Sequence, residues 1–338
     1  MSHFVSKNFE DVKIRQFILL YFLFLFFSLT NSVSSQIVSW KNYNTKNSCV
    51  PSNSIQSIAI GKNNILWLGT RDAGLVKFIN YKRCMVFNKS NSQLPNNNVY
   101  VVKIDSFNNV WAGTFGGGIA KFNGRTWEIY NTSNSGISHN WIYSIAFDKQ
   151  NSVWIGTWGG GISVFKGSTW NVYSPANTII PRYKVPSLLI DRKNNKWIGD
   201  LKGLLKFDGK NWTWYNEKYG FPTESVYSLA MGKDQTLWIG FKQGGLGKFN
   251  GESFFHYTSK NSGLPSDIIY TVAIDKSNVV WVGTFGNGIA KFEKGVWKCF
   301  NSSNSKLTDN LIFDIQIDST NRKVIGTMKG GLFILSEL

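Results

Sequence analysis

The sequence predicts an all-β fold, a seven-bladed β-propeller with four antiparallel strands in each blade, closed by its N-terminal strand. Two spaced motifs support this prediction. The first is the tetrad Trp-x-Gly-Thr, with some copies altered in the last residue, which recurs every 41 to 44 residues and begins at Trp67, Trp111, Trp154, Trp197, Trp238, Trp281 and, degenerate, Val324. The second is an aromatic residue followed three positions later by Tyr or Phe, beginning at Trp40, Trp127, Trp170, Trp212, Phe254, Trp297 and, degenerate, Cys84. Both series have seven members, and a fixed period of this length is typical of repeat folds such as propellers.

One repeat contains four short β-rich runs separated by turn residues. In the third copy these runs cover 142–148, 153–157, 161–165 and 170–173. The last two are joined by a Lys-Gly dipeptide, and other copies carry Asn-Gly or Asp-Gly there, which suit tight hairpins. Each repeat is therefore expected to form a four-stranded antiparallel blade. No long apolar period of 3.6 residues follows the first 36 residues, so helices should be scarce.

The two ends of the repeat region complement each other. Residues 37–43 have the pattern of a fourth strand without the three that precede it, whereas residues 312–335 have the pattern of three strands without a fourth. The N-terminal strand is expected to complete the last blade, which closes the ring and removes an exposed sheet edge. The recurring Trp of the second strand is expected to lie between neighbouring blades, because a lone blade cannot bury both of its faces.

The first 35 residues have the pattern of a secretory signal peptide. Lys13 and Arg15 precede an apolar run at 17–29, and small residues lead to a predicted cleavage site before Gln36. The run is short for a membrane span, so an uncleaved anchor is the less favoured alternative. We therefore expect a signal peptide at 1–35, a propeller at 36–338, and export to the periplasm or the extracellular space without a membrane span in the mature chain.

The composition limits the classes of partner. The formal net charge is +17 at pH 7, and the basic residues are scattered singly through the repeats. No basic run is interleaved with aromatic residues, which argues against a nucleic-acid partner. A basic soluble surface fits better, with attraction to a polyanion such as an acidic glycan as the alternative. Cys49, Cys84 and Cys299 have irregular spacing, so we expect at most one disulfide and no metal site built from them.

Two segments carry a resemblance to a known family. Residues 154–162 read Trp-Ile-Gly-Thr-Trp-Gly-Gly-Gly-Ile, and residues 261–265 read Asn-Ser-Gly-Leu-Pro. With their counterparts over about residues 37–335, they resemble the two-component regulator propeller repeat. The resemblance implies a propeller of the kind found in the periplasmic sensor regions of hybrid sensor kinases, where such domains are thought to bind glycan fragments. Because the sequence ends directly after the last repeat, we expect a free-standing recognition propeller without kinase domains.

Three further features receive structural interpretations. The glycine-rich residues 113–118 precede a strand and do not open a helix, so we expect a turn with positive φ and not a nucleotide site. Asp residues end the first strand in five repeats, where their side chains can bond to nearby backbone amides: Asp105, Asp148, Asp191, Asp275 and Asp318. His139 and His256 occupy different repeat positions, and no metal-ligand set or nucleophile motif stands out, so no cofactor or metal is expected.

Ligand-binding residues are expected where two kinds of loop open on one face of the ring, between the second and third strands and after the fourth strand. The residues predicted to line this channel mouth are Arg71, Phe115, Trp158, Tyr183, Asp200, Glu224, Lys242, Asp267 and Phe285. The aromatic members suit stacking on sugar rings, and Arg71 and Lys242 suit pairing with a carboxylate or sulfate. Alternatively, the aromatic residues only plug the channel. The fourth repeat departs most from the pattern, since Asp200 replaces the Thr of its tetrad.

The sequence thus predicts an exported module that recognises an extracellular or periplasmic ligand, a carbohydrate before a peptide, without catalysis. Two alternatives remain open. One is a propeller lyase or hydrolase acting at the same channel mouth. The other is a scaffold or adhesion module that binds a protein partner.

Overall fold

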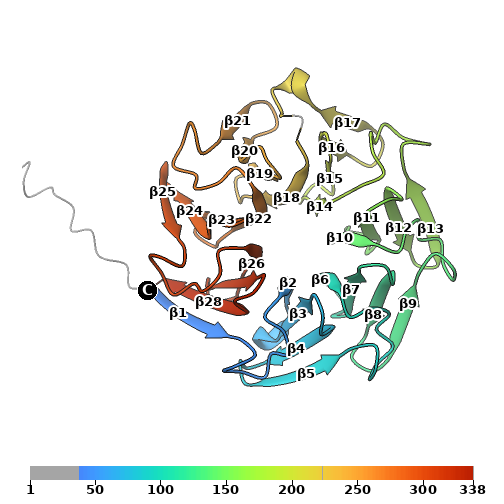
Figure 1. Ribbon diagram of the computed structural model, residues 1–338. Coiled ribbons are helices and arrows are strands. Elements are labelled where there is room, and N and C mark those ends of the chain that lie inside the picture. The colour runs from blue at the N-terminus through green and yellow to red at the C-terminus, as the bar shows by residue number, and fades with distance from the viewer. Residues whose placement is uncertain (1–37, 223, 338) are drawn as a thin grey trace, which may run out of the picture. The chain divides into compact units, whose positions relative to one another are not determined.

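Seven four-stranded sheets, each one blade, form a ring in the computed structural model, which describes residues 38–222 and 224–337 (Figure 1). Residues 40–336 form one compact unit. The predicted signal peptide, residues 1–35, lies outside the described residues. The predicted seven-bladed propeller is confirmed.

Within each blade the strands pair in antiparallel order from the central channel outward. The first strands line the channel and are β2 (Ile55–Ile60), β6 (Val99–Ile104), β10 (Ile142–Phe147), β14 (Ser187–Ile190), β18 (Val226–Met231), β22 (Ile269–Ile274) and β26 (Ile312–Ile317). The second strands carry the tetrad and are β3 (Leu66–Thr70), β7 (Val110–Thr114), β11 (Val153–Thr157), β15 (Lys196–Asp200), β19 (Leu237–Phe241), β23 (Val280–Thr284) and β27 (Lys323–Thr327).

The third strands are β4 (Leu75–Ile79), β8 (Ile119–Phe122), β12 (Ile162–Lys166), β16 (Gly203–Phe207), β20 (Leu246–Phe249), β24 (Ile289–Glu293) and β28 (Leu332–Glu337). The outer strands are β5 (Arg83–Phe87), β9 (Trp127–Tyr130), β13 (Thr169–Tyr173), β17 (Trp212–Tyr215), β21 (Phe254–Tyr257), β25 (Val296–Phe300) and, for blade 7, β1 (Val38–Tyr43). Two short 3-10 helices, η1 (Lys62–Asn64) and η2 (Glu217–Tyr219), are the helical elements of the described chain. Neither they nor any other described segment form a helix that could cross a membrane.

The N-terminal strand closes the ring as predicted. The sheet of blade 7 has the order β1-β28-β27-β26, and β26 in turn contacts β2 of blade 1. The side-chain amide of Asn42 donates hydrogen bonds to the carbonyls of Gly330 (2.9 Å) and Leu332 (3.3 Å), which adds to the pairing of these strands. The edge that an open array would expose is therefore covered.

The recurring Trp packs between blades, which confirms the predicted position. Trp67 of blade 1 lies in one apolar cluster with Val99, Val110 and Phe122 of blade 2, and its ring centre is 6.1 Å from that of Phe122. In the same way, each of four further tetrad tryptophans packs into the apolar cluster of the blade that follows it: Trp111, Trp154, Trp197 and Trp238. The core is thus a series of interfaces between neighbouring sheets.

The Asp at the end of the first strand holds a turn and also binds this Trp. Oδ1 of Asp105 accepts hydrogen bonds from the amides of Phe107 (3.0 Å) and Asn109 (2.8 Å), and Oδ2 accepts one from the Trp111 indole (2.9 Å). The indole contact recurs at Asp148, Asp191 and Asp275. The predicted structural role is confirmed, and the indole is a partner that the sequence analysis did not anticipate.

The Gly of the tetrad lets neighbouring blades approach closely. A Cβ atom on Gly113 would lie 2.6 Å from the side chain of Ile142 in the next blade, and one on Gly69 would lie 2.7 Å from the Val99 carbonyl oxygen. The Thr that follows holds the next turn, since the Thr114 hydroxyl donates to the Gly118 carbonyl at 2.8 Å. The predicted turn at 113–118 is confirmed, with φ of +85° at Gly118.

We expect Trp111→Ala to lower the free energy of unfolding by about 3–5 kcal/mol, because it leaves a cavity between blades 2 and 3 and removes a partner of Asp105. Chemical denaturation followed by circular dichroism measures the change. The matched control is Phe107→Ala in the same blade, where the side chain is 71% exposed and the expected loss is below about 0.5 kcal/mol. Equal losses in both variants would contradict the proposed importance of the inter-blade contact.

Candidate ligand site at the channel mouth

A β-bulge near the start of the first strand turns one residue toward the channel in six of the blades. The strand pairing skips this residue, which leaves it out of the ladder. Bulges of this kind re-aim a side chain. The skipped residues all line the channel cavity and are Gln56, Tyr100, Tyr143, Tyr227, Tyr270 and Phe313. Blade 4 has no register shift, and Pro186 lies at the corresponding position.

Five half-buried aromatic side chains of blades 2 and 3 form a continuous surface at the mouth, called here the aromatic wall. Phe115 stacks on Trp141 with ring centres 4.1 Å apart, and Trp141 lies 6.1 Å from Trp158. Trp158 stacks on Tyr143 at 4.8 Å, and Tyr143 lies 4.5 Å from Tyr100. The wall therefore runs from the turn after β7 down into the channel.

A second aromatic cluster comes from blades 5, 6 and 7. Phe285, which is 41% exposed, stacks on Tyr270 at 5.2 Å, and Tyr270 lies 5.8 Å from Phe313. Tyr227 meets Tyr270 edge-on at 5.6 Å. Aromatic rings thus line the mouth on separate arcs of the ring of blades.

Two lysines lie against these aromatic surfaces. The Lys184 ammonium, from the loop before β14, lies over the ring of Trp158 and 5.8 Å from the ring centre of Tyr143. Lys242, which follows β19, places its ammonium 6.0 Å from the ring centre of Tyr227. Such contacts between an ammonium and a ring face are attractive. Burial, and next the charge of Lys242, lower the pKa of Lys184 to about 8, so Lys184 is still mostly protonated at neutral pH.

The structure brings the two predicted kinds of loop together on one face. The turn amides of Gly161 and Gly245 donate to the backbone carbonyls of Tyr183 and Asp267 in the next blade, at 2.8 and 2.9 Å. Of the predicted site residues, Phe115, Trp158 and Phe285 join the aromatic surfaces and Lys242 lies beside Tyr227. The other exposed or half-exposed residues among those predicted are Arg71, Tyr183, Glu224 and Asp267.

Two predicted site residues occupy structural positions. Both carboxylate oxygens of Asp267 accept hydrogen bonds from Ser259, from its amide at 2.7 Å and its hydroxyl at 3.0 Å, which hold the loop after β21. Asn side chains make the equivalent amide contact in four other blades. Asp200 is completely buried, and its Oδ1 accepts from the Lys202 amide at 3.0 Å. It does not line the channel cavity.

Several residues of the mouth were missed by the sequence analysis. The bulged tyrosines follow the first residue of their strands, and this column is aromatic in five of seven repeats. The aromatic column was visible in the sequence. The bulge was not, and without it nothing in the strand pattern indicates that this side chain faces the channel. Trp141 and Lys184 stand in loops where the repeats differ, so no periodic signal identifies them.

The histidines lie in different surroundings. Nδ1 of His139 accepts a hydrogen bond from the Trp141 amide at 3.0 Å, so this ring lies beside the aromatic wall. The His256 ring bonds to the Gly244 carbonyl on the outer part of blade 5. Within residues 38–222 and 224–337, no group of three or more His, Cys, Asp or Glu side chains is placed to hold a metal. The aromatic rings and lysines of the mouth suit it to stacking and to charge-assisted hydrogen bonding.

Four segments match the family described as "Two component regulator propeller": residues 49–72, 93–116, 136–159 and 263–286. The chain contains two-component regulator propeller repeats. Each matched segment runs from the loop before a first strand to the turn after the tetrad, so the repeats include both kinds of loop at the mouth. No curated protein matches the sequence.

Solved structures share the fold at low sequence identity. An extracellular domain described as part of a hybrid two-component system from B. thetaiotaomicron has a TM-score of 0.73 and 20% identity, over 88% of this chain and 42% of that one. The present chain therefore spans less than half of that domain. Virginiamycin B lyase from Staphylococcus aureus has a TM-score of 0.74 and 11% identity, over 89% of this chain and 100% of the lyase. PorZ, a surface component of the type-IX secretion system of Porphyromonas gingivalis, has a TM-score of 0.69 and 16% sequence identity. The match covers 84% of this chain and 46% of PorZ.

The buried Asp200 makes stability depend on pH. Burial raises its pKa to about 7, against the lowering effect of the Lys202 and Leu201 amides and of Arg182. Because the unfolded chain loses this proton first, the free energy of unfolding falls as the pH rises from about 4 to 7, by on the order of 3 kcal/mol. Asp200→Asn removes this dependence, so its stability relative to the native protein should increase across that range.

Thermal denaturation at pH 4 to 8 measures this effect. Asp208→Asn is the control, since Asp208 belongs to the same blade but its side chain is exposed. A constant difference between the Asp200→Asn variant and the native protein at all pH values would show that the native carboxyl titrates normally.

Proposed function

We propose that this chain is an exported recognition propeller that binds a saccharide without covalent chemistry at the mouth of its central channel. Its fold and repeats relate it to the sensor regions of two-component systems. The observation that carries the proposal is the aromatic wall, where Trp158 and Phe115 stand half exposed above a channel cavity of about 190 Å³.

The wall has the properties of a saccharide platform. Ring faces offer apolar area to the C–H faces of a sugar, and a few convergent polar groups fix its orientation. Lys184 and Lys242 supply donors next to the rings, and three other residues of the mouth loops supply polar side chains: Arg71, Tyr183 and Glu224. Most of the platform is built from neighbouring blades 2 and 3, so a saccharide bound there would lie to one side of the channel axis.

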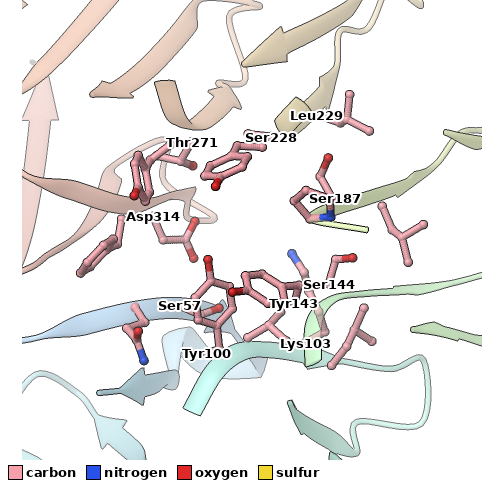
Figure 2. A pocket seen from close by; sticks show the side chains of 18 of the residues that line it. Ser57, Tyr100, Lys103, Tyr143, Ser144, Ser187, Ser228, Leu229, Thr271 and Asp314 are labelled. Carbon is pink, nitrogen blue, oxygen red and sulfur yellow. The ribbon is translucent and has the colours of Figure 1, made fainter. Parts of the chain in front are cut away.

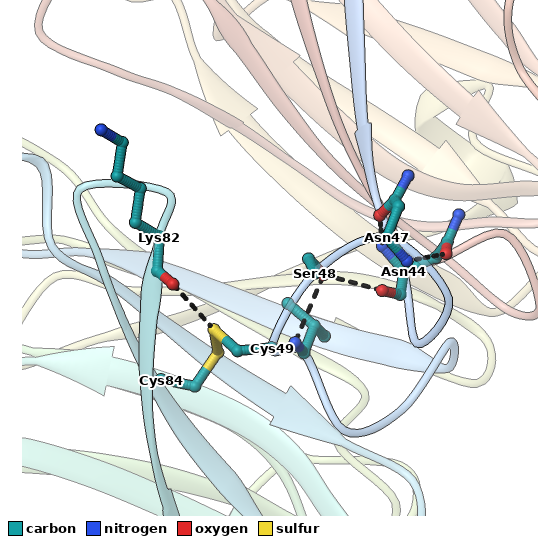
Figure 3. Close-up of a disulfide and its surroundings, with 7 residues drawn as sticks. Asn44, Asn47, Ser48, Cys49, Lys82 and Cys84 are labelled. Atoms are coloured by element: carbon teal, nitrogen blue, oxygen red, sulfur yellow. Dashed lines mark hydrogen bonds between the residues drawn. A yellow bond between two sulfur atoms is a disulfide. The ribbon is translucent and has the colours of Figure 1, made fainter.

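A disulfide supports export. Cys49, in the loop before β2, is bonded to Cys84 on β5, whereas Cys299 is free (Figure 3). This agrees with the expectation of at most one bridge. Structural disulfides persist mainly in the periplasm, in secreted proteins and at the cell surface. The similar domain from B. thetaiotaomicron is described as extracellular, and the predicted signal peptide points to the same location.

We expect saccharide ligands to raise the melting temperature of the purified protein in proportion to the logarithm of their concentration once binding saturates. A screen of neutral and acidic oligosaccharides would identify the class. Trp158→Ala should abolish the shift, measured against its own ligand-free melting temperature. Phe255→Ala is the control, because Phe255 is 55% exposed but lies on the outer strand β21.

The outcomes separate the alternatives. An equal shift in both variants would place binding away from the aromatic wall. No shift with any oligosaccharide would overturn the saccharide proposal and favour a protein partner. Mass spectrometry of the recovered saccharide would detect cleavage or elimination products, and their formation would show that the protein is an enzyme.

A further inference from the structure

The channel below the aromatic wall is lined by polar groups from every blade. Its cavity, of about 190 Å³, has room for roughly six water molecules. The first strands of all seven blades supply the lining, and Figure 2 shows side chains such as Tyr100, Lys103, Tyr143 and Asp314 directed into one common space. Most inner-strand hydroxyls next to them are already engaged: for example, Ser144 donates to the Val185 carbonyl at 3.2 Å.

Four phenol groups in this space are unengaged. Tyr100, Tyr143, Tyr227 and Tyr270 come from four blades, and each is turned inward by its bulge. Among the described residues, none of their hydroxyls has a hydrogen-bond partner. Burial raises the pKa of all four, and for Tyr100 the three other phenols raise it further. The ring centres of Tyr100 and Tyr143 are 4.5 Å apart and those of Tyr227 and Tyr270 are 5.6 Å apart. All four phenols remain protonated donors at neutral pH, since their pKa values are raised.

The charged groups of the channel are not equivalent. Oδ2 of Asp314 accepts from the Ile58 amide at 2.7 Å and Oδ1 accepts from Gln316 at 2.9 Å, so this carboxylate already has partners. The Lys103 ammonium has neither a hydrogen bond nor an ion pair within the described part of the chain, although it is near enough to oppose the rise in the pKa of Asp314 that burial causes. A half-buried cation without a direct partner favours an anion beside it.

We propose that the channel binds the acid group of an anionic saccharide, with the Lys103 ammonium and the tyrosine hydroxyls as donors. This rests on the proposed saccharide binding at the mouth and names the class of saccharide. The sugar rings would lie on the aromatic wall, and the carboxylate or sulfate would reach past Tyr143 into the channel toward Lys103. Lys184 and Lys242 at the entrance add positive charge along the same path.

The test compares uronic-acid oligosaccharides with their carboxyl-reduced counterparts, which differ only in the acid group. Sulfated oligosaccharides and their desulfated forms make a second arm, which distinguishes a carboxylate from a sulfate ligand. Isothermal titration calorimetry on the purified protein should show at least about tenfold tighter binding of the acidic member of the preferred pair, the size of effect expected for hydrogen bonds to a charged group.

Three variants locate the acid group. Lys103→Gln should remove the preference for the acidic member, and Tyr143→Phe and Tyr270→Phe should each reduce it several-fold while keeping the aromatic ring. Lys166→Gln is the control, since it removes the same charge from the exposed last residue of β12, at the opposite end of the blade from the mouth loops. It should leave both affinities unchanged. If Lys103→Gln does not fold, the two tyrosine variants decide the outcome.

Each failure has a distinct meaning. Equal binding of acidic and neutral members would overturn the inference and leave saccharide binding at the mouth intact. An acidic preference that persists in Lys103→Gln and in both tyrosine variants would place the acid group outside the channel. Absence of binding by every oligosaccharide would overturn the inference together with the proposed function.

Discussion

The close approach of neighbouring blades is the constraint on which the rest of the structure depends. It leaves no space for a Cβ atom at the tetrad glycines such as Gly113 and Gly326, so each second strand lies directly against the first strand of the next blade. Because the blades are so close, small polar side chains of one first strand accept hydrogen bonds from backbone amides of the next. Ser57 accepts a hydrogen bond from the Val102 amide at 3.0 Å, and Ser228 accepts one from the Val272 amide at 2.9 Å. At the interface between blades 7 and 1, the Asp314 carboxylate accepts the equivalent hydrogen bond from the Ile58 amide at 2.7 Å.

The candidate site is a product of the same arrangement. A first strand that packs against two neighbours along its length has little freedom to present side chains to the channel. The bulge resolves this by inserting a residue that does not pair, and in four blades that residue is tyrosine. The repeat thus builds a similar scaffold in each blade and leaves the bulge position, together with the mouth loops, to vary most. Blade 4 uses neither the bulge nor the tetrad Thr, which makes it the most distinct sector of the ring.

The fold could be predicted from the sequence because its determinants repeat. Seven tetrads in phase specify the number of blades, and the incomplete ends specify how the ring closes. The candidate site was predictable only in part. Phe115 and Trp158 follow the tetrad directly, so their place at the mouth follows from the repeat. Lys184 and Trp141 belong to loops whose course depends on the contacts of the folded ring, and the loop-holding hydrogen bonds of Asp267 become visible only when Ser259 is placed beside it.

The pairing of β1 with β28 has a consequence for the order of folding. Blades 1 to 6 are made of strands that are consecutive in the chain, so each can form from local hairpins. Blade 7 instead joins residues nearly 300 positions apart, as the contact from Asn42 to Leu332 shows. Closing so long a loop costs conformational entropy before any contact compensates for it. We therefore expect the ring to close last, with the six local blades already formed and able to guide the two ends of the chain together.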